Sequence, residues 1–272
     1  MIRAAKPAAA LASLALTILT ASAVPAAGVT APPPAAVAAA DPLAALRGQQ
    51  PRWHPCATSP EDTAGAELDA AGAGCTELAV PLDYRRPDGR TTGVALARLP
   101  ATDRARRLGT LFYNPGGPGV PARDLALALR RAAPGLAARY DIIGMDPRFV
   151  GASTPLDCGW PTAGPGSAGP DRLTFDRSAE VAKGLAARCA PYRELLPHIS
   201  TRNTARDMDL VRAVLGEETI AYLGSSYGSY LGEVYLQLFP GRMCGQRTGR
   251  AQSPGPGFFR PDPPPTGPWA FQ

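Results

Sequence analysis

The sequence predicts an α/β fold, with a mostly parallel sheet and helices on both of its faces. Short apolar runs alternate along the chain with longer segments whose apolar residues recur at helical spacing. This alternation is typical of parallel sheets, because each parallel strand needs a crossover helix, which then covers one face. The chain has 272 residues, of which 45% are hydrophobic, so it is long enough to form one large domain.

The first two expected strands come before this alternation and should pair with each other. Residues 75–82 and 92–99 flank the turn Pro87-Asp88-Gly89, as antiparallel strands do, and we expect them at the edge of the sheet. Thr204 is the expected N-cap of one later helix, and Pro240 should end another. Further strands are expected at residues 109–113, 140–145 and 219–223, and helices at 123–131, 175–188, 204–215 and 226–239.

The N-terminal residues 1–23 have the three-part layout of a signal peptide. Basic residues precede an apolar run at residues 8–20, and the small residues Ala21-Ser22-Ala23 provide a cleavage site. This run is shorter than the roughly 20 apolar residues of a membrane-spanning helix, so we expect a secreted protein without a stable membrane anchor. Residues 24–50 are rich in alanine and proline and should form a flexible lead-in to a folded domain at 51–243.

The chain contains five cysteines, which would pair in an oxidising compartment. Their spacing suggests disulfides Cys56–Cys75 and Cys158–Cys189 and leaves Cys244 over, although four cysteines allow three connectivities. There is no Cys-x-x-Cys spacing and no Cys/His cluster, so the sequence predicts no metal site.

The charge pattern and the glycine-rich segment narrow the class of ligand. The net charge of +5 comes from scattered basic residues without interleaved aromatic residues, so no nucleic-acid partner is expected. The segment 114–119 matches neither the dinucleotide-binding nor the P-loop pattern, and no cofactor is predicted. The sequence does not indicate an oligomeric state.

The strongest functional signal is Gly224-Ser225-Ser226-Tyr227-Gly228. It matches the pattern G-x-S-x-G between an expected strand and an expected helix. At such a turn the central serine adopts a strained backbone conformation, and small residues are needed two positions before and after it. The helix that follows favours negative charge at its N-terminus. We therefore predict that Ser226 is a nucleophile.

A second signal is the glycine-rich loop Asn114-Pro115-Gly116-Gly117-Pro118-Gly119, which follows the expected strand at 109–113. A tetrahedral acyl intermediate needs preorganised N–H donors for its oxyanion. We expect such donors from Gly116 or Gly117 and from Tyr227, the residue after the nucleophile.

A third segment, residues 146–153, follows the expected strand at 140–145. It contains Asp146 and Arg148, and such a loop more often braces an oxyanion loop through hydrogen bonds than takes part in chemistry. We therefore expect a structural role for both residues.

These three motifs occur in an order that resembles the secreted actinobacterial tripeptidyl aminopeptidases, relatives of the proline iminopeptidases with the α/β-hydrolase fold. The resemblance rests on residues 113–119, 141–153 and 224–232 and extends over about 53–243. It implies a serine exopeptidase that acts on peptides with a free N-terminus, and it also implies the two disulfide pairings suggested above. There are two departures: Asn114 stands where proline iminopeptidases commonly have histidine, and Phe149 stands where related loops usually carry glycine.

The rest of a catalytic triad is not evident in the sequence. In this fold the serine is followed by an acid and then by a histidine, but both histidines, His54 and His198, precede Ser226. Glu233 falls within an expected helix, and Asp262 lies in the tail at 244–272, which has seven prolines and five glycines. We expect this tail to be disordered. A frameshift or truncation explains it better than a natural tail does. We therefore expect the domain to be only the N-terminal part of an α/β hydrolase.

Three functions fit these observations. The first is a serine aminopeptidase by descent that is inactive because the triad is incomplete. The second is an active secreted esterase whose base comes from elsewhere, and the third is a non-catalytic exported binding protein. The missing base disfavours the second, since a serine hydroxyl without a base is a weak nucleophile.

Overall fold

The computed structural model describes residues 41–160, 169 and 171–244. The expected signal peptide at 1–23, the first part of the lead-in and the tail from residue 245 onward lie outside the described residues.

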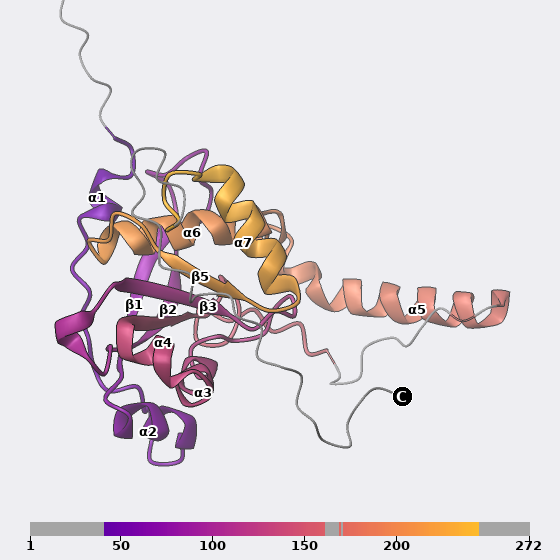
Figure 1. Ribbon diagram of the computed structural model, residues 1–272. Coiled ribbons are helices and arrows are strands. Elements are labelled where there is room, and N and C mark those ends of the chain that lie inside the picture. The colour runs from indigo at the N-terminus through magenta and orange to yellow at the C-terminus, as the bar shows by residue number, and fades with distance from the viewer. Residues whose placement is uncertain (1–40, 161–168, 170, 245–272) are drawn as a thin grey trace, which may run out of the picture. The chain divides into compact units, whose positions relative to one another are not determined.

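The described strands form one five-stranded sheet in the order β1-β2-β4-β3-β5 (Figure 1). Strand β1 pairs antiparallel with β2, and β2 pairs antiparallel with β4, whereas β3 pairs parallel with both β4 and β5. The predicted antiparallel edge beside parallel strands is thus confirmed. The strands are β1 (Gly74–Pro81), β2 (Thr91–Leu99), β3 (Gly109–Asn114), β4 (Tyr140–Met145) and β5 (Ala221–Gly224).

Each α-helix predicted from the sequence is present in the structure. The described residues also form three further α-helices and three short 3₁₀ helices, Arg104–Arg106, Ala190–Tyr192 and Leu196–His198. The helices are α1 (Ala44–Arg47), α2 (Thr63–Ala70), α3 (Leu125–Ala132), α4 (Pro134–Arg139), α5 (Arg172–Cys189), α6 (Thr201–Val214) and α7 (Tyr227–Leu238). The predicted N-cap of α6 was wrong: Ser200 occupies that position and accepts a hydrogen bond from Asn203 N–H. Thr204 lies inside the helix, where its hydroxyl donates to the Ser200 carbonyl.

Helices cover both faces of the sheet and create two apolar cores. Successive strand residues point to opposite faces, so Ile143 and Phe112 pack with α6 and α7, while Ile142 and Leu111 pack with α2, α3 and α4. Figure 1 shows α6 and α7 on one side of the sheet and α3 and α4 on the other. This layering holds the carboxyl ends of β3, β4 and β5 side by side.

The predicted flexible lead-in at 24–50 needs correction at its C-terminal end. Helix α1 forms within it, and Leu46 of this helix packs against the core beneath α6 and α7. The Gln49 side chain accepts from Ala79 N–H and donates to Ala79 C=O, so it extends the hydrogen bonding of β1. Leu46 and the Gln49 amide thus connect this segment to the core and to the free edge of β1.

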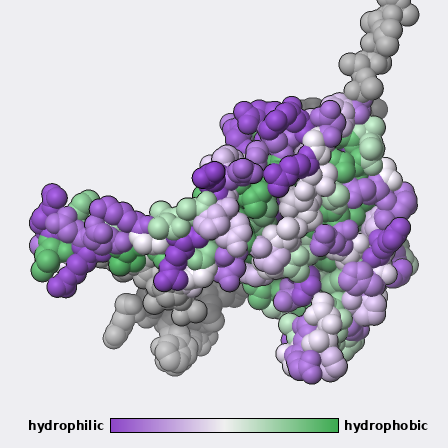
Figure 2. Space-filling view, turned by 180° about the vertical axis from the view of Figure 1, so that it is seen from behind, coloured by the Kyte–Doolittle hydropathy of each residue, from purple (hydrophilic) through white to green (hydrophobic). Residues whose placement is uncertain are grey.

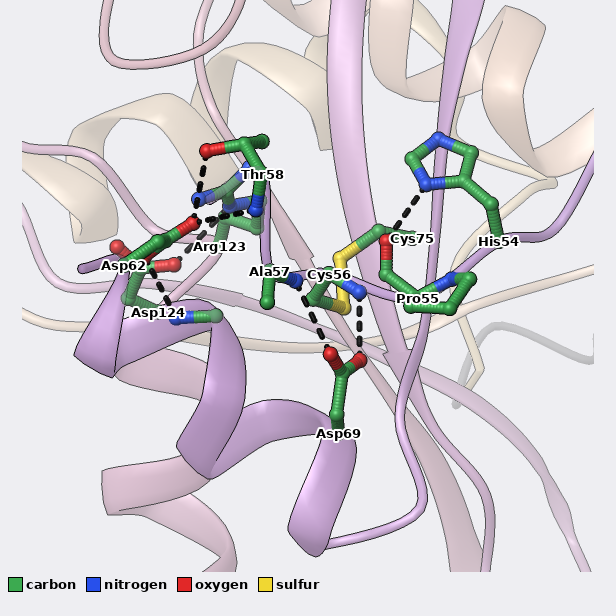
Figure 3. The surroundings of a disulfide bond; sticks show 11 residues. His54, Pro55, Cys56, Ala57, Thr58, Asp62, Asp69, Cys75, Arg123 and Asp124 are labelled. Atoms are coloured by element: carbon green, nitrogen blue, oxygen red, sulfur yellow. Dashed lines mark hydrogen bonds and ion pairs between the residues drawn. A yellow bond between two sulfur atoms is a disulfide. The ribbon is translucent and has the colours of Figure 1, made fainter. Parts of the chain in front are cut away.

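The structure contains both disulfides whose pairing was suggested by sequence spacing, Cys56–Cys75 and Cys158–Cys189. Figure 3 shows the first beside Asp69 of α2, whose carboxylate accepts hydrogen bonds from the N–H groups of Cys56 and Ala57. The remaining thiol, that of Cys244, is free and exposed.

Helix α5 contacts the rest of the described protein mainly through its C-terminal end. Of its 18 residues only Leu185 and Cys189 are buried. Figure 2 shows hydrophilic and apolar residues interspersed along this helix, where Leu173, Phe175 and Val181 are exposed. Within the part of the chain that the structure describes, no helix has both the length and the apolar character needed to span a membrane.

Candidate active site

Ser226 lies at a sharp turn between β5 and α7, as the sequence predicted. Its φ and ψ are 52° and −125°, a conformation that residues other than glycine rarely adopt and that costs on the order of 1–3 kcal/mol. The residue is exposed and immediately precedes the first turn of α7. The turn therefore presents the serine hydroxyl at the carboxyl edge of the sheet.

The glycines on either side of Ser226 are required by close backbone contacts. A Cβ at Gly224 would lie 2.4 Å from the carbonyl oxygen of Gly228, and a Cβ at Gly228 would lie 2.4 Å from that of Asn114. Real Cβ atoms do not approach backbone oxygens this closely, so larger residues at either position would open the turn. The tight turn also brings the end of β3 against the start of α7.

The glycine-rich loop lies against this turn, and Gly116 is its point of closest approach. A Cβ at Gly116 would lie 2.6 Å from the Ser225 carbonyl oxygen, 3.0 Å from the Ser226 Cβ and 3.3 Å from the Tyr227 nitrogen. The missing side chain therefore leaves open the space in front of Tyr227 N–H. Among the described residues this N–H has no hydrogen-bond partner, as expected for the first residue of a helix.

The expected donor role of Gly116 needs correction. Its N–H donates to Asn114 Oδ1 over 3.0 Å and so is already engaged within the loop. Gly117 adopts a φ of 111°, and a Cβ there would lie 2.8 Å from the Gly119 nitrogen, so its glycine serves the turn of the loop. Of the three residues singled out as oxyanion donors, Gly117 and Tyr227 therefore have backbone N–H groups without a hydrogen-bond partner among the described residues.

Asp146 holds the loop segment that follows the glycines. Its Oδ1 accepts from the N–H groups of Ala122 and Arg123, both over 2.8 Å, and its Oδ2 accepts from Ala152 N–H over 2.9 Å. A Cβ at Gly151 would lie 2.3 Å from this Oδ2, so only glycine leaves room for the carboxylate. Asp146 therefore connects the loop after β3 to the loop after β4.

Arg148 also has a structural position, although it does not bond the glycine-rich loop. Its guanidinium donates to both carboxylate oxygens of Asp207 on α6 and to the carbonyl groups of Pro81, Leu82 and His198. Arg148 and Asp207 are both buried, and Tyr84 O–H also donates to Asp207. Each of the five N–H groups of this arginine thus has an acceptor.

The backbone conformation of Phe149 explains why related loops usually carry glycine at this position. Its φ is 65°, in the left-handed region that glycine adopts without penalty. The ring is buried and the Phe149 N–H donates to the Ser153 carbonyl, so packing and pairing of the loop offset the strain.

A cleft of about 520 Å³ lies beside Ser226, between the glycine-rich loop and the start of α6. Tyr227 lines it, and the Tyr227 hydroxyl is 2.5 Å from Thr201 Oγ1 at the start of α6. Arg148 is the charged residue of this lining, and its N–H groups are all engaged as described above. The apolar lining residues are Pro118, Pro147, Val150, Ile199 and Leu231.

Neither histidine of the chain belongs to this cleft. His54 lies beside the Cys56–Cys75 disulfide, where its Nδ1 is 2.7 Å from the Pro55 carbonyl oxygen (Figure 3). His198 lines a different pocket, together with Asp83 and Glu194. Glu233 is exposed on α7, and Asp262 lies outside the described residues. The described residues around Ser226 therefore include no histidine or carboxylate that lines its cleft.

Comparison with known proteins agrees with this geometry. The family model of the alpha/beta hydrolase fold matches residues 109–244, which include the glycine-rich loop and the Ser226 turn. The match covers half of the chain, so the chain belongs to the α/β-hydrolase fold family.

Among curated relatives, the tripeptidyl aminopeptidase of Streptomyces coelicolor is 42% identical over 61% of this chain and 32% of its own length. Two proteins of Mycobacterium tuberculosis are each 36% identical: serine protease Hip1, over 72% of this chain and 38% of that protein, and carboxylesterase B, over 69% and 36%. A solved structure, the proline iminopeptidase of Mycobacterium smegmatis, is 18% identical over 62% of this chain and 41% of its own, with a TM-score of 0.36. The chain thus spans about a third of the length of the curated relatives.

Proposed function

We propose that this chain carries the nucleophile of an exported serine hydrolase that acts on peptides with a free N-terminus through an acyl-enzyme on Ser226. The observation that carries the proposal is the strained turn at Ser226, with Tyr227 N–H facing the space that Gly116 leaves open. A hydroxyl beside a free backbone donor suits attack on a carbonyl group, because the donor can stabilise the oxyanion that forms.

Peptides are the proposed substrates because two of the relatives bear the names of peptidases, and the relative with the higher identity is a tripeptidyl aminopeptidase. The mostly apolar cleft beside Ser226 supports neutral residues next to the bond that is cleaved. Export is proposed from the signal-peptide layout of residues 1–23.

An esterase is the second candidate, since carboxylesterase B is also a relative and an apolar cleft would accept an acyl chain. Ester bonds need less activation of the leaving group than amides, so an incomplete site would act on esters first. Comparing hydrolysis of p-nitrophenyl acetate with that of an alanyl peptide p-nitroanilide distinguishes the two candidates.

We further propose that the 272-residue chain has little turnover by itself. His54 and His198 line other pockets, and no carboxylate lines the cleft among the described residues. A positioned general base contributes about 10²- to 10⁴-fold, so its absence should slow attack by Ser226 on this scale.

The test is labelling by a fluorophosphonate probe, with and without added imidazole, and with Ser226→Ala as the control. We expect slow labelling of the native chain, acceleration by imidazole acting as an external base, and no labelling of the variant. Fast labelling without imidazole would show that a base is present and contradict the proposed low turnover. No labelling in imidazole would contradict the nucleophile itself.

A further inference from the structure

The side chain of Asn114 has a donor without a partner, at the edge of the cleft that this residue lines. Its Oδ1 accepts the Gly116 N–H, and an N–H group needs an acceptor, so this contact fixes which side of the amide is oxygen. The Nδ2 group therefore points the other way, and among the described residues it has no hydrogen-bond partner. The residue is only 6% exposed and lines the cleft.

Asn114 is the first residue of the glycine-rich loop and contacts the Ser226 turn. Its carbonyl oxygen accepts from Ser225 N–H over 3.1 Å, and a Cβ at Gly228 would lie 2.9 Å from Asn114 Oδ1. The backbone and the Oδ1 atom thus fix the side chain from two directions. Among the described residues Asn114 Nδ2 is not one of the fully buried unpaired atoms, so it keeps access to the cleft. A ligand oxygen in the cleft can therefore accept its hydrogen bond.

We propose that Asn114 Nδ2 donates a hydrogen bond to an oxygen of the substrate acyl group bound beside Ser226, together with Tyr227 N–H. The proposal rests on the proposed function and adds a residue to it. It also replaces the expected contribution of Gly116 N–H, which the same side chain engages. The partner must be an acceptor oxygen, which means a scissile carbonyl, its oxyanion, or a carboxylate of the released peptide.

The experiment uses a released-product mimic, the tripeptide Ala-Ala-Ala with free termini, and measures its Kd for the full chain by NMR titration. Asn114→Asp retains an acceptor for Gly116 N–H but replaces the donor by a carboxylate oxygen. We expect its Kd to rise about 10- to 100-fold, the range for hydrogen bonds to charged groups. Asn114→Ala removes the donor without adding charge and should also weaken binding, which keeps the test open if Asn114→Asp folds poorly.

The matched control is Asn203→Asp, the same change at the other asparagine of the chain. Asn203 Nδ2 already donates to the His198 carbonyl, and the residue does not line the cleft, so the Kd should change by no more than about threefold. Near-UV circular dichroism of each variant verifies the fold.

Equal affinity of the native chain and both Asn114 variants for the tripeptide would overturn the assignment. The assignment would also fail if the native chain showed no saturable binding at about 10 mM tripeptide, a concentration well above ordinary KM values. The labelling experiment described above separates this result from failure of the proposed function. Labelling of Ser226 with equal tripeptide affinities would reject Asn114 alone, whereas donor-dependent binding without any labelling would reject the nucleophile alone.

Discussion

A buried aspartate lies near each end of strand β4, and the two are held by different donors. Asp141, near the amino end, accepts from the guanidinium groups of Arg98 and Arg107 and from Ala101 N–H. Asp146, just past the carboxyl end, accepts from three backbone N–H groups. Both residues are only 2% exposed.

The difference indicates a different role for the carboxylate at each end of the sheet. An arginine side chain can neutralise a carboxylate without fixing the backbone conformation of the segment that carries the arginine. Backbone N–H donors fix that path, because each bond holds a peptide group in place. The end that carries Ser226 and the glycine-rich loop is therefore the end at which a carboxylate organises loops.

The largest loss of stability is expected for the buried ion pair Arg148–Asp207. Replacing Arg148 by Met leaves the Asp207 carboxylate buried with Tyr84 as its remaining side-chain donor. We expect the free energy of unfolding to fall by about 3–5 kcal/mol, the usual cost of breaking a buried pair on one side. This free energy is measured by urea denaturation, with circular dichroism as the signal.

The control for this change is the double variant Arg148→Met with Asp207→Leu. Because replacing both partners by apolar residues is often neutral, it should recover most of the lost stability. A single variant that loses less than about 1 kcal/mol would mean that water reaches Asp207.

A smaller effect is expected for Asp146→Ala, which leaves three N–H groups without their acceptor. The expected loss is on the order of 3 kcal/mol, together with faster amide exchange at Ala122, Arg123 and Ala152. Asp146→Asn is the matched control, since its Oδ1 can still accept from Ala122 and Arg123 and should preserve more stability. Unchanged exchange at these amides in the alanine variant would show that Asp146 does not organise the loops.

The smallest loss of stability is expected for Asp141, near the amino end of β4, and it depends on pH. Burial by itself raises the pKa of Asp141, but the Ala101 N–H and the two guanidinium groups together hold that pKa below its usual value. A lowered folded-state pKa adds stability that is complete above the unfolded pKa of about 3.9 and is lost as the pH falls through the folded value.

Asp141→Asn should therefore cost about 1–2 kcal/mol at pH 7 and flatten the dependence of stability on pH below about pH 4. Denaturant titrations of both proteins between pH 3 and 7 measure this change. An unchanged slope in the acid range would assign the acid sensitivity to other carboxylates.

Local signals made much of the fold and the nucleophile predictable. The turn at Ser226 follows from two glycines whose neighbours leave no room for a Cβ. Strand β4 was placed at its observed bounds, because its apolar run is short and bounded by polar residues. The α6 cap was misplaced because both Ser200 and Thr204 are capping residue types and the helical period alone does not distinguish adjacent turns.

The remaining features depend on contacts that no local pattern encodes. The lead-in residues around Leu46 are ordered because a core and the edge of β1 are available to receive them. Arg148 could not be assigned its acceptors from the sequence, because Pro81, Leu82 and Asp207 lie far from it along the chain.

The sequence by itself determined the order of strands and helices, the disulfide candidates and the identity of the serine, because spacing and residue type control short-range geometry. Only the tertiary structure decided which backbone donors beside Ser226 are free. That outcome depends on competition between acceptors: Asn114 Oδ1 engages Gly116 N–H, while Tyr227 N–H remains open and Asn114 Nδ2 is left without a partner among the described residues.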